Sequence, residues 1–121
     1  MTNPRLIVAI DTFDLTKANA ILDQLDPKLC KIKIGSVVFN ALGKSFIHEV
    51  SQRGFKIFLD LKLHDIPNTV QKGIKAINSL GPILTTVHIS GGSDMLKASI
   101  INKKNTKILG VSILTSLNSK Q

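Results

Sequence analysis

The sequence predicts an α/β fold of the (β/α)8 TIM-barrel type, of which this chain of 121 residues supplies about four β-α units plus a fifth strand. Short apolar runs alternate with segments of helical periodicity along the whole chain. The apolar runs are nearly continuous, which is typical of parallel strands that are covered by helices. A doubly wound dinucleotide-binding sheet would carry glycines after its first strand, but Asp11-Thr12-Phe13-Asp14 contains none, so a barrel is favoured.

The predicted strands are short apolar runs that recur at intervals of roughly 25 to 30 residues, a repeat that suits parallel strands joined by helices. In chain order they are residues 5–11, 29–35, 56–62, 83–89 and 107–114. The helices predicted between them are residues 14–25, 36–53, 67–81 and 94–104. The first helix has apolar residues at the spacing of 3.6 residues per turn. The third begins at Pro67, because proline is favoured in the first helical turn.

The chain is expected to form a single domain over residues 1–121, the N-terminal part of a (β/α) barrel. A complete barrel takes roughly 200 residues or more, so in this interpretation the chain is truncated and the C-terminal half of the barrel is absent. The first and fifth strands would then be open sheet edges, which invite pairing with another chain.

The composition is that of a soluble globular protein, with 43% hydrophobic and 20% charged residues. The longest apolar run, residues 6–10, is too short to span a bilayer. Residues 1–5 lack the pattern of a secretory signal, so we expect a cytoplasmic protein without a membrane segment. The single cysteine, Cys30, lies in an apolar stretch and is predicted to be a small core residue rather than a nucleophile.

The net charge of +8 raises the question of a nucleic-acid partner. The basic residues are scattered and nearly all are lysines, with only Arg5 and Arg53 as arginines. The chain has no Tyr or Trp to stack on bases, so we predict no nucleic-acid partner. A lysine-rich surface of this kind is compatible with small anionic substrates.

Charged residues end three consecutive predicted strands that are otherwise apolar. Asp11 ends the first strand, Lys33 lies near the end of the second, and Asp60 and Lys62 lie at the end of the third. Side chains alternate along a strand, so Asp60 and Lys62 share the face opposite to their leucine and isoleucine neighbours. The apolar face suits the helix layer, which directs the charged face into the barrel. Barrel enzymes place their chemistry at this carboxyl end of the strands.

These charges allow two interpretations. A single Asp or Lys at a strand end is usually solvated or paired and carries no function. Four of them at matching positions, with Asp65 close behind, instead indicate a network in which each buried charge has an opposite partner. Flanking carboxylates favour the ammonium form of Lys62. An enclosed ammonium is a proton donor rather than a Schiff-base nucleophile, which requires the neutral amine.

The stretch FLDLKLHDIPNT, residues 58–69, resembles the signature of orotidine 5'-phosphate decarboxylase through its motif Asp60-x-Lys62-x-x-Asp65. Four further segments fall where that family has its characteristic blocks, namely VAIDTFD around Asp11, KIKIG around Lys33, VHISGG at 87–92 and VSILTS at 111–116. The resemblance covers the whole chain. It implies a homodimeric (β/α)8 barrel that decarboxylates orotidine 5'-phosphate to uridine 5'-phosphate in de novo pyrimidine biosynthesis, with no metal or organic cofactor.

The same resemblance implies roles for individual residues. Lys62 would be the acid that protonates C6 of the pyrimidine as carbon dioxide leaves, and Asp60 would lie beside the substrate carboxylate. Lys33 and Asp11 would contact the ribose hydroxyls and hold the charged array. The other implied site residues are Asp65 and Thr69, which would reach into the partner subunit's site, Ile66, which would line it, and Thr115, which would hydrogen-bond the pyrimidine.

Other functions stay open at the level of the sequence. The family's phosphate-binding groups come from the second half of the barrel, so one alternative is a non-catalytic truncated half-barrel that is inactive or needs a complementary half. Metal-dependent sugar-phosphate decarboxylases and hexulose-phosphate synthases share the Asp-x-Lys-x-x-Asp motif, but they typically carry Glu where this sequence has Lys33. His64-Asp65 has no further ligand at metal spacing, so no metal is expected. Residues 90–93 are predicted as a turn with Ser93 as helix N-cap rather than as a phosphate loop.

Overall fold

The computed structural model describes residues 3–101, 104–114 and 116 of the chain. Strands and helices alternate in it from Leu6 to Val111, as the sequence predicts. The strands are β1 (Leu6–Ile10), β2 (Cys30–Gly35), β3 (Ile57–Leu63), β4 (Leu84–His88) and β5 (Lys107–Val111). The helices are α1 (Leu15–Asp23), α2 (Ser36–Gln52), α3 (Pro67–Asn78) and α4 (Ser93–Ile101), with a short 3-10 helix, η1 (Ile89–Gly91), after β4.

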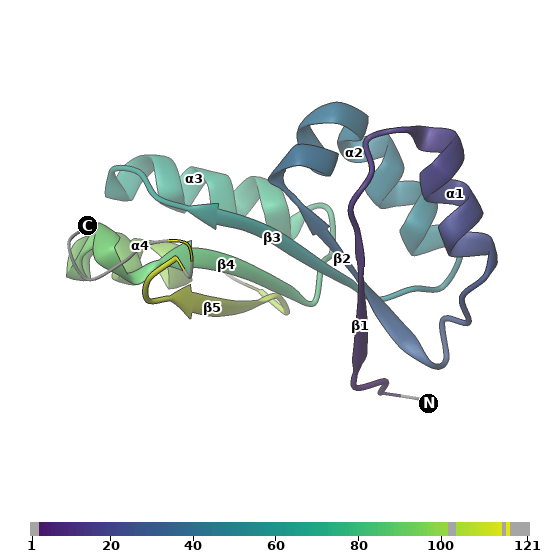
Figure 1. The fold of residues 1–121 in the computed structure, drawn as a ribbon. Helices are drawn as coiled ribbons and strands as arrows, with labels where there is room; N and C mark the ends of the chain where they lie inside the picture. Colours follow the sequence, from purple (N-terminus) through teal and green to yellow (C-terminus); the bar gives the residue numbers. More distant parts are fainter. Residues whose placement is uncertain (1–2, 102–103, 115, 117–121) are drawn as a thin grey trace.

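The five strands form one parallel sheet in the order β1-β2-β3-β4-β5, so each strand pairs with its neighbours in the sequence. The sheet is strongly twisted. In Figure 1 β1 runs almost vertically, whereas β5 runs almost horizontally. Each connection between parallel strands passes through a helix, which is the repeating unit of a barrel wall. The prediction of an α/β fold that forms part of a (β/α) barrel is therefore confirmed.

One face of the sheet is apolar and packs against the helices. In β2 the buried residues Cys30, Ile32 and Ile34 alternate with less buried ones, and β3 buries Ile57 and Leu59 in the same way. Large apolar side chains of the helices complete this core; among them are Leu22, Phe46, Ile47, Val50, Val70 and Ile74. The prediction that Cys30 is a core residue is confirmed. The opposite face of β2 and β3 is left to the charged residues.

Two helices begin where the sequence predicts and for the expected physical reasons. The carboxylate of Asp14 caps α1 by accepting hydrogen bonds from the backbone N–H groups of Thr16 (2.9 Å) and Lys17 (3.2 Å). Helix α3 begins at Pro67, and it packs along α4 (Figure 1). Both helices therefore begin a few residues after the charged ends of β1 and β3.

Several predicted ends differ from the structure; the predicted helix 67–81 ends at Asn78 and the predicted strand 107–114 ends at Val111, and three further details differ. Helix α2 is interrupted at Gly43, whose φ of 69° lies in a region that glycine adopts without strain. The fourth strand ends at His88 and continues into η1. Ser93 is the first residue of α4 rather than its cap, because the backbone N–H of Leu96 donates to the carbonyl of Gly92 (3.1 Å) and so places Gly92 in the capping position.

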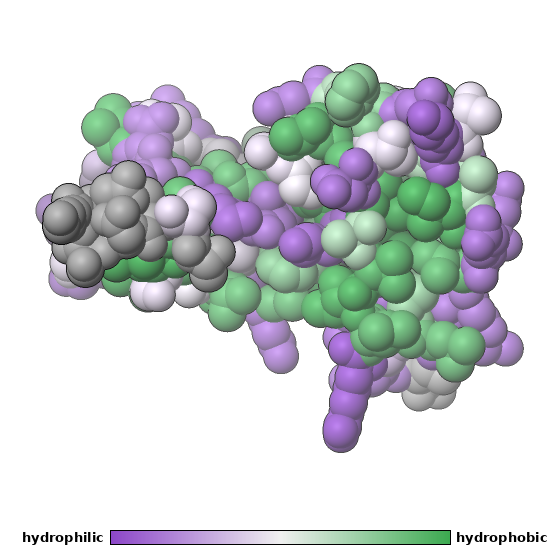
Figure 2. Space-filling view, in the orientation of Figure 1, coloured by the Kyte–Doolittle hydropathy of each residue, from purple (hydrophilic) through white to green (hydrophobic). Residues whose placement is uncertain are grey.

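The surface of the described residues carries apolar side chains along β1. Figure 2 shows hydrophobic surface over this strand, where Leu6 is 62% and Ile7 41% exposed. Apolar side chains on an outer strand of a parallel sheet are normally covered on both faces. Leu6 and Ile7 point to opposite faces, so within the described part of the chain both faces are exposed at the start of β1, whereas Ile10 at its end is buried. No helix in that part is both long and apolar enough to cross a membrane.

Candidate active site

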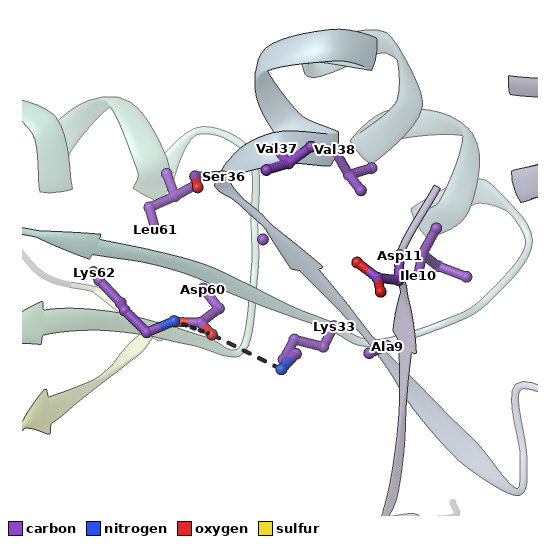
Figure 3. Close-up of a pocket in the computed structure, with 11 residues that line it drawn as sticks. Ala9, Ile10, Asp11, Lys33, Ser36, Val37, Val38, Asp60, Leu61 and Lys62 are labelled. Atoms are coloured by element: carbon purple, nitrogen blue, oxygen red, sulfur yellow. Dashed lines mark hydrogen bonds and ion pairs between the residues drawn. The ribbon is translucent and has the colours of Figure 1, made fainter. Parts of the chain in front are cut away.

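The charged ends of three strands meet at one cavity, as the sequence predicts. Asp11 directly follows β1, Lys33 lies in β2, and Asp60 and Lys62 lie in β3, and all four line a cavity of about 410 Å³ (Figure 3). The first turn of α2 forms another part of the wall. Pockets that bind small molecules have volumes of about 300 to 1,000 Å³. The cavity therefore has the size of a small-molecule site at the carboxyl end of the strands.

The carboxylate of Asp60 is the common ion-pair partner of both lysines, and it accepts a hydrogen bond from Lys62. Its Oδ2 atom lies 2.8 Å from Nζ of Lys62 and 4.0 Å from Nζ of Lys33. Figure 3 shows the two ammonium groups on opposite sides of this carboxylate. The Asp60 side chain is 10% exposed and each lysine side chain is 39% exposed. A nearly buried negative charge is thus satisfied by two cations that remain accessible, which is the predicted alternating arrangement for these three residues.

The backbone of β3 is irregular where this array is built. Between the pairs Leu59–Thr85 and Leu63–Val87, β3 advances by two more residues than β4. Such a bulge bends a strand and aims its side chains differently from regular alternation. Within it Lys62 has a φ of 49°, which makes it the one non-glycine residue of the described ranges with positive φ. The charged pair of β3 does lie together, but the predicted reason, regular alternation of the strand, is wrong at Lys62.

Thr86 is a site residue that the sequence analysis missed. Its hydroxyl accepts a hydrogen bond from the backbone N–H of Lys62 (2.9 Å) and donates one to Oδ1 of Asp60 (2.7 Å). The residue is 2% exposed. The signal that points to it is the polar pair Thr85-Thr86, which lies between the apolar residues Leu84 and Val87 of β4. Thr86 is also two residues from His88, and so shares its face of β4.

The surroundings of Asp60 favour its ionised form. Burial raises the pKa of this carboxyl, but the hydrogen bonds from Lys62 and Thr86, together with the positive charges of Lys62 and Lys33, outweigh that effect. The pKa of Asp60 therefore lies below its ordinary value. A fixed carboxylate between two ammonium groups is suited to hold a cationic proton donor in one position.

The other predicted site residues lie apart from this cavity or outside the described ranges. Asp65, Ile66 and Thr69 are exposed between β3 and the first turn of α3, and they do not line the cavity. The Asp65 carboxylate accepts a hydrogen bond from the backbone N–H of Ile66 (2.7 Å). Thr115 lies outside the described residues. The structure thus brings together Asp11 and the charged residues Lys33, Asp60 and Lys62 around the cavity. Asp65, Ile66 and Thr69, in the segment after β3, do not line it.

Two histidines lie side by side where the segment after β3 passes the end of β4. The ring centroids of His64 and His88 lie 5.2 Å apart with the rings tilted by 40°. The chain that follows Lys62 therefore lies close to the end of the strand that carries Thr86. Across residues 3–101, 104–114 and 116, no group of three or more His, Cys, Asp and Glu side chains is placed to hold a metal ion.

Comparisons with known proteins point to the family that the motif resembles. The family model described as "Orotidine 5'-phosphate decarboxylase / HUMPS family" matches residues 4–121. The orotidine 5'-phosphate decarboxylase of Vibrio cholerae is 43% identical over 98% of this chain and 54% of its own length. That of Coxiella burnetii is also 43% identical, over 96% of this chain and 52% of its own length.

A solved structure shows the same arrangement of elements. The crystal structure of orotidine 5'-phosphate decarboxylase from Lactobacillus acidophilus matches with a TM-score of 0.86 and 38% identity, over 98% of this chain and 57% of that one. This chain spans about half the length of the curated relatives that it matches. Since the family model covers nearly all of its residues, the chain belongs to the orotidine 5'-phosphate decarboxylase/HUMPS family.

Proposed function

We propose that this protein decarboxylates orotidine 5'-phosphate to uridine 5'-phosphate, a step of de novo pyrimidine biosynthesis. The observation that carries the proposal is the array of Lys33, Asp60 and Lys62 at the strand ends of a chain that belongs to this family. The relatives from Vibrio cholerae and Coxiella burnetii are named for this activity. The substrate carries a phosphate and a carboxylate, and both are attracted by a chain with a net charge of +8.

Lys62 is the proposed proton donor. In the reaction the bond between C6 of the pyrimidine and its carboxylate carbon breaks, carbon dioxide leaves, and the electron pair stays on C6. Lys62 then gives a proton to C6 and regains one from solvent. Its ammonium donates to Asp60 and lines the cavity with its side chain 39% exposed, which leaves N–H donors for a ligand. An ammonium beside the reacting carbon stabilises the negative charge as it develops.

The other three cavity residues are proposed to orient the substrate. Asp60 would lie beside the substrate carboxylate, since its position next to the proton donor is fixed by hydrogen bonds on both carboxylate oxygens. Lys33 and Asp11 would contact the ribose hydroxyls from the side of the cavity formed by β1 and β2. One is a hydrogen-bond donor and the other an acceptor, and a sugar hydroxyl accepts from the first and donates to the second.

We further propose that the chain is a single domain, the N-terminal part of a barrel, in a cytoplasmic homodimer that works without a cofactor. Asp65 and Thr69 would reach into the partner subunit's site, with Ile66 lining it, and Thr115 would hydrogen-bond the pyrimidine. The exposure of residues 65, 66 and 69 next to the cavity-lining strand supports a contact with a second subunit.

Release of carbon dioxide from orotidine 5'-phosphate is the direct test of the proposed reaction. Lys62→Ala should lower the rate at least about 100-fold, the lower range of what a positioned general acid contributes. Lys31→Ala is the matched control, because Lys31 lies in β2 two residues before Lys33 and does not line the cavity. Unchanged turnover in Lys62→Ala would contradict the assigned role. Wild-type chain that releases no carbon dioxide would favour the non-catalytic half-barrel, and loss of activity on chelation would contradict cofactor-free catalysis.

Mixing two inactive variants tests whether the site is shared between subunits. Lys62→Ala and Asp65→Asn would each inactivate both sites of a homodimer. In an isologous dimer their mixture should regain about a quarter of the wild-type activity, because half of the dimers are hybrids and each hybrid has one intact site. No recovery, while native mass spectrometry shows that hybrid dimers form, would place Asp65 in its own subunit's site.

A further inference from the structure

We propose that Thr86 is the positioning residue of this site, whose hydroxyl fixes the carboxylate of Asp60 and the backbone of Lys62 relative to each other. The catalytic consequence of this role rests on the proposed function, whereas the positioning itself rests on the contacts of three described residues. Thr86 lies in β4, a different strand from the two residues that it joins, and it does not line the cavity.

The first argument is the closed set of hydrogen bonds around the hydroxyl. Thr86 Oγ1 accepts from the Lys62 N–H (2.9 Å) and donates its proton to Asp60 Oδ1 (2.7 Å). The other oxygen of Asp60 accepts from Nζ of Lys62 (2.8 Å). A hydroxyl has only one proton to donate, and here that proton goes to Asp60 while the oxygen accepts from Lys62. These two partners together fix the orientation of the hydroxyl. The ring formed in this way leaves the carboxylate one orientation and holds the ammonium against its outer oxygen.

The second argument is the backbone of Lys62. A left-handed residue that is neither glycine nor asparagine is strained and persists only where its surroundings hold it. The bulge shifts the register at this point, so the N–H of Lys62 needs a partner other than a regular ladder carbonyl. The Thr86 hydroxyl is that partner. It therefore stabilises the conformation that turns the Lys62 side chain back onto Asp60.

The neighbouring threonine provides a matched control. Thr85 is as buried as Thr86, but its side chain lies on the other face of β4. Its hydroxyl donates to the backbone carbonyl of Leu59 in β3 (2.8 Å). Thr85→Val and Thr86→Val therefore each remove one buried hydroxyl from the same strand. Only the second change removes a contact with the charged array.

The experiment follows the Asp60 carboxyl by carbon-13 NMR titration in the wild type and in Thr86→Val, Thr86→Ser and Thr85→Val. In Thr86→Val the titration should move to higher pH, because the carboxylate loses a hydrogen-bond donor. Thr86→Ser keeps the hydroxyl and should restore the wild-type curve, and Thr85→Val should leave it unchanged. Under the proposed function, Thr86→Val also lowers kcat about 10- to 100-fold with little change in KM, as expected for a misplaced proton donor.

Equal titration of Asp60 in the wild type and Thr86→Val would overturn the proposal, and so would an equal shift in Thr85→Val. Hydrogen exchange in the wild type gives a measurement that needs no variant. The amide of Lys62 should be protected, and exchange at the rate of an open loop would also overturn the proposal. If the wild type does not decarboxylate but Thr86→Val still shifts Asp60, the proposed function fails while the positioning role stands.

Discussion

Replacement of Asp60 by asparagine changes one charge at the centre of the site and keeps its shape. Asparagine retains an acceptor for the hydroxyl of Thr86, but it places an uncharged amide against Nζ of Lys62, which now lies 2.8 Å from a carboxylate oxygen. A hydrogen bond between charged groups contributes about 1.5 to 3 kcal/mol. The lysines at this site are 39% exposed, which screens the interaction and favours the lower value. We expect Asp60→Asn to lower the free energy of unfolding by about 1.5 to 2 kcal/mol at neutral pH.

The pH dependence of this loss in the free energy of unfolding distinguishes the contribution of the Asp60 charge from that of side-chain packing. Because the pKa of Asp60 is lowered in the folded state, its stabilising contribution is complete above the unfolded pKa of ~3.9 and is lost as pH falls through the folded pKa. The wild type should therefore approach Asp60→Asn in stability as the solution is acidified below about pH 4. Urea unfolding followed by circular dichroism, at neutral pH and in steps toward acid, measures the gap.

The ion pair of Asp23 with Arg53 is the control. Its two atoms are 2.7 Å apart, close to the 2.8 Å between Lys62 and Asp60, but the Asp23 side chain is 67% exposed. Asp23→Asn should cost less than about 1 kcal/mol at neutral pH. A loss in Asp60→Asn that does not shrink on acidification, or that is no larger than that of Asp23→Asn, would refute the account of Asp60 as a carboxylate held in its charged form by its partners.

Two further predictions concern the fold around the site. Asp14→Ala should lower the free energy of unfolding by about 1 kcal/mol, because α1 loses the carboxylate that caps it. In urea unfolding, Asp14→Asn should cost much less, because asparagine is also a good N-cap. Equal losses in the two variants would rule out capping. Cys30 should react far more slowly with a thiol reagent in the native protein than in urea, because burial, and to a lesser extent the charge of Asp26, raises the pKa of its thiol. Native labelling as fast as in urea would contradict the core position of Cys30.

The strands and their apolar face could be predicted because a parallel sheet imposes a strong local pattern. Residues 29–35 and 56–62 read as strands from composition alone, and their alternation placed Lys33 and Asp60 on the face away from the helices. Both placements agree with the structure. Helix α3 was predictable for the same local reason, since Pro67 both starts a helix and ends the preceding segment.

The features that could not be predicted depend on contacts between distant parts of the chain. The bulge in β3 is a feature of its pairing with β4. No residue of the motif is of a type that predicts a bulge. The role of Thr86 depends on a neighbour 24 residues earlier in the chain. Threonine is also an ordinary strand residue, so composition alone gave no reason to separate Thr86 from Thr85.

The left-handed conformation of Lys62 has a consequence for how this motif is used outside its own protein. Because the partner that holds it comes from β4, the twelve residues FLDLKLHDIPNT do not contain all the information needed to shape the site. The contact that holds Lys62 exists only where β4 lies against β3, so the geometry of this lysine belongs to the tertiary structure rather than to the strand alone. Transplanting the motif into another barrel would transfer the chemical groups but not their arrangement, unless a hydroxyl at the position of Thr86 went with them.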